Sequence, residues 1–124
     1  MSNGRRLAIL RAAFWAAALF AFVMAVLPQP PELPGAPSDK IQHIAAFFVL
    51  AALASVAYPA RSPVFLGAAL SLFGAFIELV QWIPALHRDA DPVDWVADTA
   101  AAALMLIALH WLRARLSDTV AERS

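Results

Sequence analysis

The chain has 124 residues, of which 62% are apolar and 15% are charged, and its nine basic and nine acidic residues give a formal net charge of zero. Average soluble domains are roughly 45–50% apolar and about 25% charged, so this composition indicates a protein whose main solvent is lipid. It excludes a disordered tail and a nucleic-acid binder with a basic surface. The chain has no Cys, which excludes disulfides, thiolate metal sites and a Cys nucleophile.

Four apolar stretches are long enough to cross a membrane, which takes a helix of ~20 mostly apolar residues. The sequence predicts helices at about 7–27, 41–58, 64–83 and 93–112. Prolines interrupt the chain between these stretches, at Pro28, Pro30, Pro31, Pro34, Pro37, Pro59, Pro63, Pro84 and Pro92. The predicted fold class is therefore all-α, an integral membrane four-helix bundle made by one domain over residues 1–124.

The first stretch has one alternative, a cleaved signal peptide, because Arg5 and Arg6 precede the apolar run. The run is long for the apolar region of a signal peptide, and a small residue is lacking at one of the two cleavage positions. We therefore favour a membrane-spanning helix.

The basic residues predict the orientation, because Lys and Arg in short loops favour the cytoplasmic side. Lys40 and Arg88 are the basic residues of the first and third connections. Seven others lie in the terminal segments and the second connection: Arg5, Arg6, Arg11, Arg61, Arg113, Arg115 and Arg123. Both termini are therefore expected in the cytoplasm, with interfacial aromatic residues at Trp82 and Trp95 outside and at Tyr58 and Trp111 inside.

Polar residues mark the outer start of the second predicted helix. Ser38 or Asp39 is expected to cap the helix, and Lys40 follows. His43 lies four residues after Asp39, so the two side chains share one helix face.

The third predicted helix carries Glu78 and Gln81 near its outer end, three residues apart and on one face. An ionised carboxylate is costly at this depth, so Glu78 should be paired, protonated or functional. The structural alternative is an ion pair with Arg88 or Lys40 that fixes helix packing.

The fourth predicted helix begins with Asp91 as N-cap before Pro92. Asp94 and Asp98 follow on one face, where two carboxylates repel unless a cation, a proton or an Arg lies between them. Since the outer ends of the last three helices lie at one level, all these polar groups are expected to meet in one pocket.

Two further features have ordinary structural explanations. Gly67, Ser71 and Gly74 form a small-residue stripe that lets the third helix pack closely on a neighbour. His87 and His110 have no polar neighbours in the sequence pattern and are interpreted as a loop and an interface residue.

These polar motifs resemble the VanZ-like family of small bacterial membrane proteins, over about residues 35–108. The family pattern Asp-Lys-x-x-His-x-x-x-aromatic is matched by Asp39, Lys40, His43 and Phe47, and Glu-x-x-Gln is matched by Glu78 and Gln81. Arg88 precedes Asp94 as in the family, whereas Asp98 and Ala101 replace the Asn and Gly of the third motif. The resemblance implies a polytopic membrane protein. The family takes its name from an association with resistance to glycopeptide antibiotics, and the resemblance implies no particular reaction.

We derive two main functional hypotheses. The first is a cell-envelope protein whose pocket binds a lipid head group, a wall precursor or an amphiphilic antibiotic, with Lys40 and Arg88 holding phosphate or carboxylate. Its candidate ligand-binding residues are Asp39, Lys40, His43, Glu78, Gln81, Arg88, Asp94 and Asp98.

The second is an enzyme on a lipid-linked substrate, with His43 and Glu78 as catalytic acid and base. In a variant of it, a divalent cation is held by His43, Glu78, Asp94 and Asp98. A proton-coupled carrier that uses Glu78 and Asp98, and a bundle whose polar groups only fix packing, are the remaining alternatives.

Overall fold

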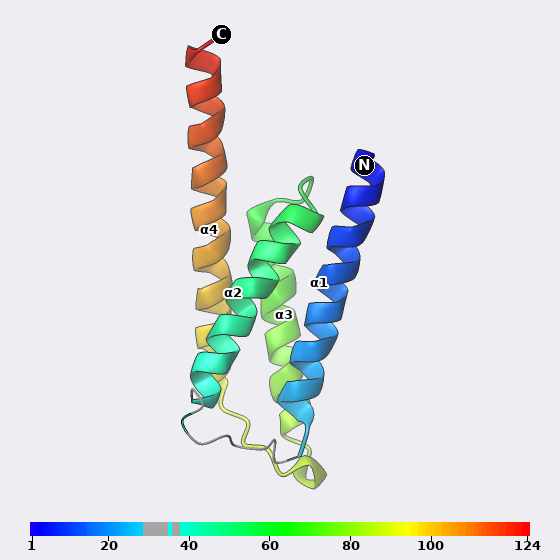
Figure 1. Cartoon of the computed structure of the whole chain (residues 1–124). Helices are drawn as coiled ribbons and strands as arrows, with labels where there is room; N and C mark the ends of the chain where they lie inside the picture. Colours follow the sequence, from blue (N-terminus) through cyan, green and yellow to red (C-terminus); the bar gives the residue numbers. More distant parts are fainter. Residues whose placement is uncertain (29–34, 36–37) are drawn as a thin grey trace.

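Four α-helices make up most of the computed structural model, which describes residues 1–28, 35 and 38–124 (Figure 1). They are α1 (Asn3–Val26), α2 (Asp39–Ala57), α3 (Pro63–Gln81) and α4 (Pro92–Glu122), with a short 3₁₀ helix, η1 (Pro84–Leu86), between α3 and α4. No strand occurs in the described ranges, so the predicted all-α class is confirmed. Pro30, Pro31, Pro34 and Pro37, which were expected to make an extended connection, lie outside the described residues.

Each α-helix begins at a side chain that accepts a hydrogen bond from a backbone N–H group of its first turn. The capping residues are Ser2, Ser38, Ser62 and Asp91. Asp91 is thus confirmed as a cap, and Ser38 rather than Asp39 caps α2. Because Ser38 supplies the cap, the carboxylate of Asp39 is left to contact other side chains.

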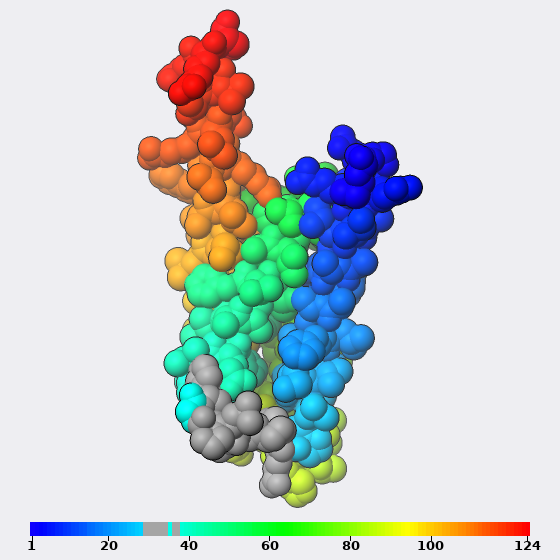
Figure 2. Space-filling model, viewed as in Figure 1, coloured from blue at the N-terminus to red at the C-terminus, as the bar shows by residue number. Residues whose placement is uncertain are grey.

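All four helices are long and apolar enough to cross a membrane, so the chain has the architecture of a multi-pass membrane protein. α2 and α3 have 19 residues each, or ~28 Å at 1.5 Å per residue, close to the ~30 Å hydrocarbon core. α4 has 31 residues, or ~46 Å, and projects beyond its neighbours at the end that carries both termini (Figures 1 and 2). The predicted end of this helix near residue 112 is wrong.

The error at α4 has a simple cause. The apolar run ends at Leu112, but residues 113–122 contain no Gly or Pro and continue the helix into the polar region.

The buried core lies between α2, α3 and α4, with α1 on the outside (Figure 1). Phe47 and Leu50 of α2 and Ile77 of α3 are each 1% exposed, whereas the buried residues of α1 are Ala18 and Ala25. Every α-helix also carries large apolar side chains that are more than half exposed. Examples are Trp15, Leu19, Phe20, Val49, Leu72, Phe76, Leu104 and Ile107. Such a surface suits contact with lipid.

The small-residue stripe allows α3 to approach its neighbours closely, as predicted. A Cβ atom on Gly74 would lie 3.3 Å from the Phe47 ring and 3.4 Å from the Trp95 ring. Ser71 adds two contacts with α4, since its hydroxyl lies 3.0 Å from that of Thr99 and its carbonyl accepts a 3.0 Å hydrogen bond from the Trp95 indole. These contacts hold α4 in place at its first turns.

Candidate functional site

The polar residues of α2, α3 and α4 converge at the bundle end opposite the termini, as the sequence predicts. Asp39, Lys40 and His43 come from the start of α2, and Asp94 and Asp98 from the start of α4. The buried polar residues at this end, each at most 9% exposed, are His43, Glu78, Gln81, Asp94 and Asp98. We call this group, together with Asp39, Lys40 and Arg88, the polar cluster.

His43 lies at the centre of the polar cluster, between two carboxylates. Its Nδ1 is 3.2 Å from Oδ2 of Asp98, and its Nε2 is 4.0 Å from Oδ2 of Asp39. Asp98 is 1% exposed and Asp39 is 61% exposed on its side chain. The buried contact fixes the imidazole ring, and the other ring nitrogen faces the more open side.

Two ion pairs flank this histidine; one joins α2 to α4, and the other joins α2 to the connection before α4. Lys40 Nζ lies 3.5 Å from Asp94 Oδ1, and Arg88 Nη2 lies 3.6 Å from Asp39 Oδ1. Asp94 and Asp98 thus each contact a basic side chain of α2, which offsets the repulsion expected between them. Both predicted anion binders, Lys40 and Arg88, already have acidic partners.

Glu78 and Gln81 make contacts that the sequence does not predict. Glu78 Oε2 accepts a 2.9 Å hydrogen bond from the backbone N–H of Asp91, rather than pairing with a basic side chain. Gln81 Nε2 donates a 2.9 Å hydrogen bond to the carbonyl of Ala25. The first contact holds the connection before α4, and the second joins α3 to the end of α1.

The polar cluster has more acid than base. It contains four carboxylates, from Asp39, Glu78, Asp94 and Asp98, against the two permanent charges of Lys40 and Arg88. Among the described residues, Glu78 Oε1, Asp94 Oδ1 and Asp98 Oδ1 are buried without a hydrogen-bond partner, although Lys40 faces the second of these oxygens. Each unmet acceptor costs about 1–3 kcal/mol, so the cluster favours a group that donates hydrogen bonds.

A divalent cation would offset these negative charges by coordination, and its ligands predicted from the sequence are His43, Glu78, Asp94 and Asp98. Within the described part of the chain, no three His, Asp or Glu residues are arranged to hold a metal ion. The geometry therefore lends this variant no support.

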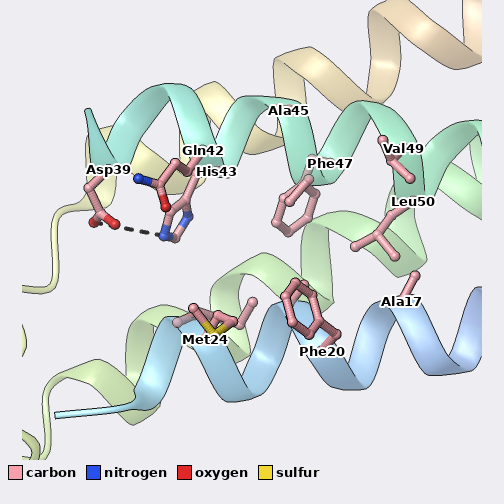
Figure 3. A pocket seen from close by; sticks show the side chains of 14 residues that line it. Ala17, Phe20, Met24, Asp39, Gln42, His43, Ala45, Phe47, Val49 and Leu50 are labelled. Carbon is pink, nitrogen blue, oxygen red and sulfur yellow. Dashed lines mark ion pairs between the residues drawn. The ribbon is translucent and has the colours of Figure 1, made fainter. Parts of the chain in front are cut away.

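A cavity of about 440 Å³ runs between α1 and α2 and meets the polar cluster at Asp39 and His43 (Figure 3). Beyond that end its walls are apolar, with Phe20 and Met24 of α1 across from Phe47 of α2 (Figure 3). The α1 residues of this cavity were missed by the sequence analysis. The residues of α1 that line it are all apolar and so carry no chemical signal.

Part of the cavity wall lies at the surface. Phe20 is 67% exposed, Val49 54% and Met24 39%. The cavity therefore opens between α1 and α2 onto the surface that faces lipid, with its polar end at the level of the ion pairs.

Comparison with known proteins adds no identification, since no family model, curated protein or solved structure matches this chain. The resemblance to the VanZ-like family consequently stays a prediction that rests on the three motifs of the polar cluster.

Proposed function

We propose that this chain is a multi-pass protein of the bacterial cytoplasmic membrane that binds an amphiphilic molecule, with the apolar part between α1 and α2 and the polar head at the polar cluster. The observation that carries this proposal is the cavity of about 440 Å³, which is apolar along α1 and ends at Asp39 and His43. Its volume falls within the roughly 300–1,000 Å³ of typical ligand pockets. The basic residues predict cytoplasmic termini. In that orientation, the end of the cavity that binds the head group lies on the outer side of the membrane.

The contacts within the polar cluster narrow the class of head group. An anionic head would have to displace Asp94 from Lys40 or Asp39 from Arg88. A head with an amine or hydroxyl groups could instead donate hydrogen bonds to Asp39, the carboxylate that lines the cavity. This favours amine-bearing or hydroxyl-rich amphiphiles, a class that includes amino lipids, wall precursors and glycopeptide antibiotics, and so keeps a role in antibiotic resistance within the proposal.

The weak packing of α1 supports access from the membrane. α1 buries Ala18 and Ala25. It is held at one end by Gln81 at Ala25, and toward the other end by the hydrogen bonds of Arg11 to the Ala57 carbonyl at 3.2 Å and of Trp15 to the Tyr58 hydroxyl at 2.9 Å. Residues 16–24 between these points are all apolar, so an apolar chain can enter from the lipid along this stretch.

The proposal is tested by titrating phosphatidylethanolamine, whose head carries an amine, and phosphatidic acid, whose head is phosphate alone, into the purified chain and counting bound lipids by native mass spectrometry. Ala21→Trp fills the cavity, and Ala100→Trp adds the same bulk at an exposed position on α4. We expect the parent chain to bind phosphatidylethanolamine more tightly than phosphatidic acid. Phosphatidylethanolamine should bind at least about tenfold more weakly to Ala21→Trp, a change of ~1.4 kcal/mol. Ala100→Trp should bind it like the parent chain. Equal binding by all three proteins would refute the proposal.

A second candidate function, an enzyme on a lipid-linked substrate, is favoured by the contact between His43 and Asp98. A carboxylate on Nδ1 orients a histidine to take a proton at Nε2, and His43 lines the cavity. His43 and Glu78 are the catalytic acid and base predicted from the sequence, whereas the carboxylate in contact with His43 is that of Asp98. Incubation with phosphatidylethanolamine should then release a water-soluble amine, and His43→Gln should stop the release while lipid still binds. Binding without any release of amine would contradict the enzyme hypothesis and leave only the binding function.

A further inference from the structure

A second cavity lies at the opposite end of the bundle, near the connection between α2 and α3. It has a volume of about 240 Å³, and its inner wall includes the buried residues Ser55, Leu66 and Leu106. Three basic side chains line its outer part: Arg61 of the connection, and His110 and Arg113 of α4. The volume is below the roughly 300 Å³ of small drug-sized pockets, so the cavity suits a compact group.

The electrostatics of this cavity favour a negative group. No Asp or Glu lines it among the residues that the structure describes. Pro63, at the first turn of α3, is also part of its wall, and the N-terminal end of a helix carries a partial positive charge. The cavity is therefore bordered by the positive charges of Arg61 and Arg113 and by the partial positive charge of this helix end.

Both arginines are already held in position without a ligand. Arg113 Nη2 donates a 3.2 Å hydrogen bond to the Ser55 carbonyl, and the Arg61 guanidinium lies 4.8 Å from the centre of the Phe65 ring. A guanidinium has five N–H donors, so one bond to Ser55 leaves Arg113 able to bind an anion. Side chains ordered beforehand lose less entropy when they bind.

The depth of the cavity in the membrane indicates where the anion would come from. Tyr58 and Trp111 are the aromatic residues predicted at this interface, and they lie next in sequence to the cavity residues Pro59 and His110. Aromatic side chains of this kind mark the level of lipid head groups. A phosphate group is the anion that membranes present at this level.

We propose that Arg61, His110 and Arg113 form a phosphate-binding site at the bundle end that carries both termini. The ligand is a phosphate group, contributed either by an anionic phospholipid head or by a soluble phosphate compound. This site is independent of the polar cluster, which lies at the other end of the chain's membrane-spanning part. His110, interpreted from the sequence as a plain interface residue, contributes to binding.

The test uses the full chain in dodecyl maltoside micelles, which contain no phosphate group, and measures the midpoint of thermal unfolding. Phosphatidylglycerol is added to the micelles in one arm, and inorganic phosphate is added to the buffer in the other. The test variant is Arg61→Gln with His110→Gln, which leaves the bond between Arg113 and Ser55 in place. Arg115→Gln is the control, because it removes a charge from the same stretch of α4 outside the cavity.

We expect phosphatidylglycerol, inorganic phosphate or both to raise the midpoint of the parent chain and of Arg115→Gln, and the arm that responds identifies the source. The double variant should unfold at the parent's midpoint in dodecyl maltoside alone and need at least about tenfold more ligand for the same rise. The proposal is overturned if neither arm raises the parent's midpoint, if the double variant responds like the parent, or if Arg115→Gln loses the response equally. The last outcome would show general charge attraction.

Discussion

His43 and Asp98 lie 55 positions apart in the chain, yet Nδ1 of the imidazole is 3.2 Å from Oδ2 of the carboxylate, and both side chains are buried. This contact joins the first turns of α2 to the second turn of α4. It places the histidine ring at the edge of the cavity that we assign to an amphiphile.

The contact predicts different results from two substitutions of Asp98. Asp98→Asn keeps an oxygen that can accept a hydrogen bond from Nδ1, so we expect little loss of stability. Asp98→Ala leaves a buried ring nitrogen unpaired, which costs about 1–3 kcal/mol. The free energy of unfolding in detergent, measured with a denaturant, should rank the parent and Asp98→Asn together above Asp98→Ala. An equal loss in both variants would show that the charge, and not the hydrogen bond, holds the two helices.

Gly74 and Gly67 on α3 offer a matched pair of alanine substitutions. A Cβ atom on Gly74 would be 3.3 Å from the Phe47 ring, which is 1% exposed, whereas one on Gly67 would be 3.6 Å from Leu106. Ala is favoured over Gly in a helix by up to about 1 kcal/mol. We expect Gly67→Ala to raise the unfolding midpoint and Gly74→Ala to lower it, because the Phe47 ring has little room to move. A rise in both variants would contradict this account of the packing.

Much of the fold could be predicted from the sequence, because the lengths of the apolar stretches and the positions of the prolines determine how many helices form and about where they lie. The caps at Ser38 and Asp91 and the stripe at Ser71 and Gly74 are local signals of this kind. The end of α4 was predicted wrongly since a search for apolar residues stops at Leu112, while helix propensity continues to Glu122.

The candidate site was predictable in membership but not in its contacts. The shared depth of His43, Glu78 and Asp98 along the bundle follows from counting residues along each helix. The pairing of Asp98 with His43 depends on how the helices are rotated against each other, which the spacing alone does not determine. Likewise, the sequence does not predict that α1 lines the cavity, because Phe20 and Met24 have the apolar character of any lipid-facing residue. Their place on the cavity wall depends on how α1 packs against α2.

Gln81 is expected to control how firmly the end of α1 is attached. Its side chain donates a 2.9 Å hydrogen bond to the Ala25 carbonyl, and Gln81→Leu removes that donor at similar size. Because the chain has no native Cys, a single cysteine in place of Ala25 reports the opening of this contact by its rate of reaction with a maleimide. We expect faster reaction in Gln81→Leu than with Gln81 retained.

The control for this measurement is a cysteine at Ala18, the other buried position of α1. It lies about two turns from Ala25, so Gln81→Leu should leave its rate unchanged. Faster reaction at both positions would mean that the whole of α1 loosens, and no change at Ala25 would mean that the hydrogen bond has no part in holding it.

The membrane orientation is tested by single cysteines at the two termini and in η1. Both termini lie at one end of the bundle and η1 at the other (Figure 1), and the arginines predict cytoplasmic termini. In intact cells, a maleimide that does not cross membranes should label Ala85→Cys, and it should label Ser2→Cys and Ser124→Cys only after permeabilisation. The reverse pattern would invert the orientation and move the polar cluster to the cytoplasmic side. Labelling of one terminus alone would contradict the even number of membrane crossings.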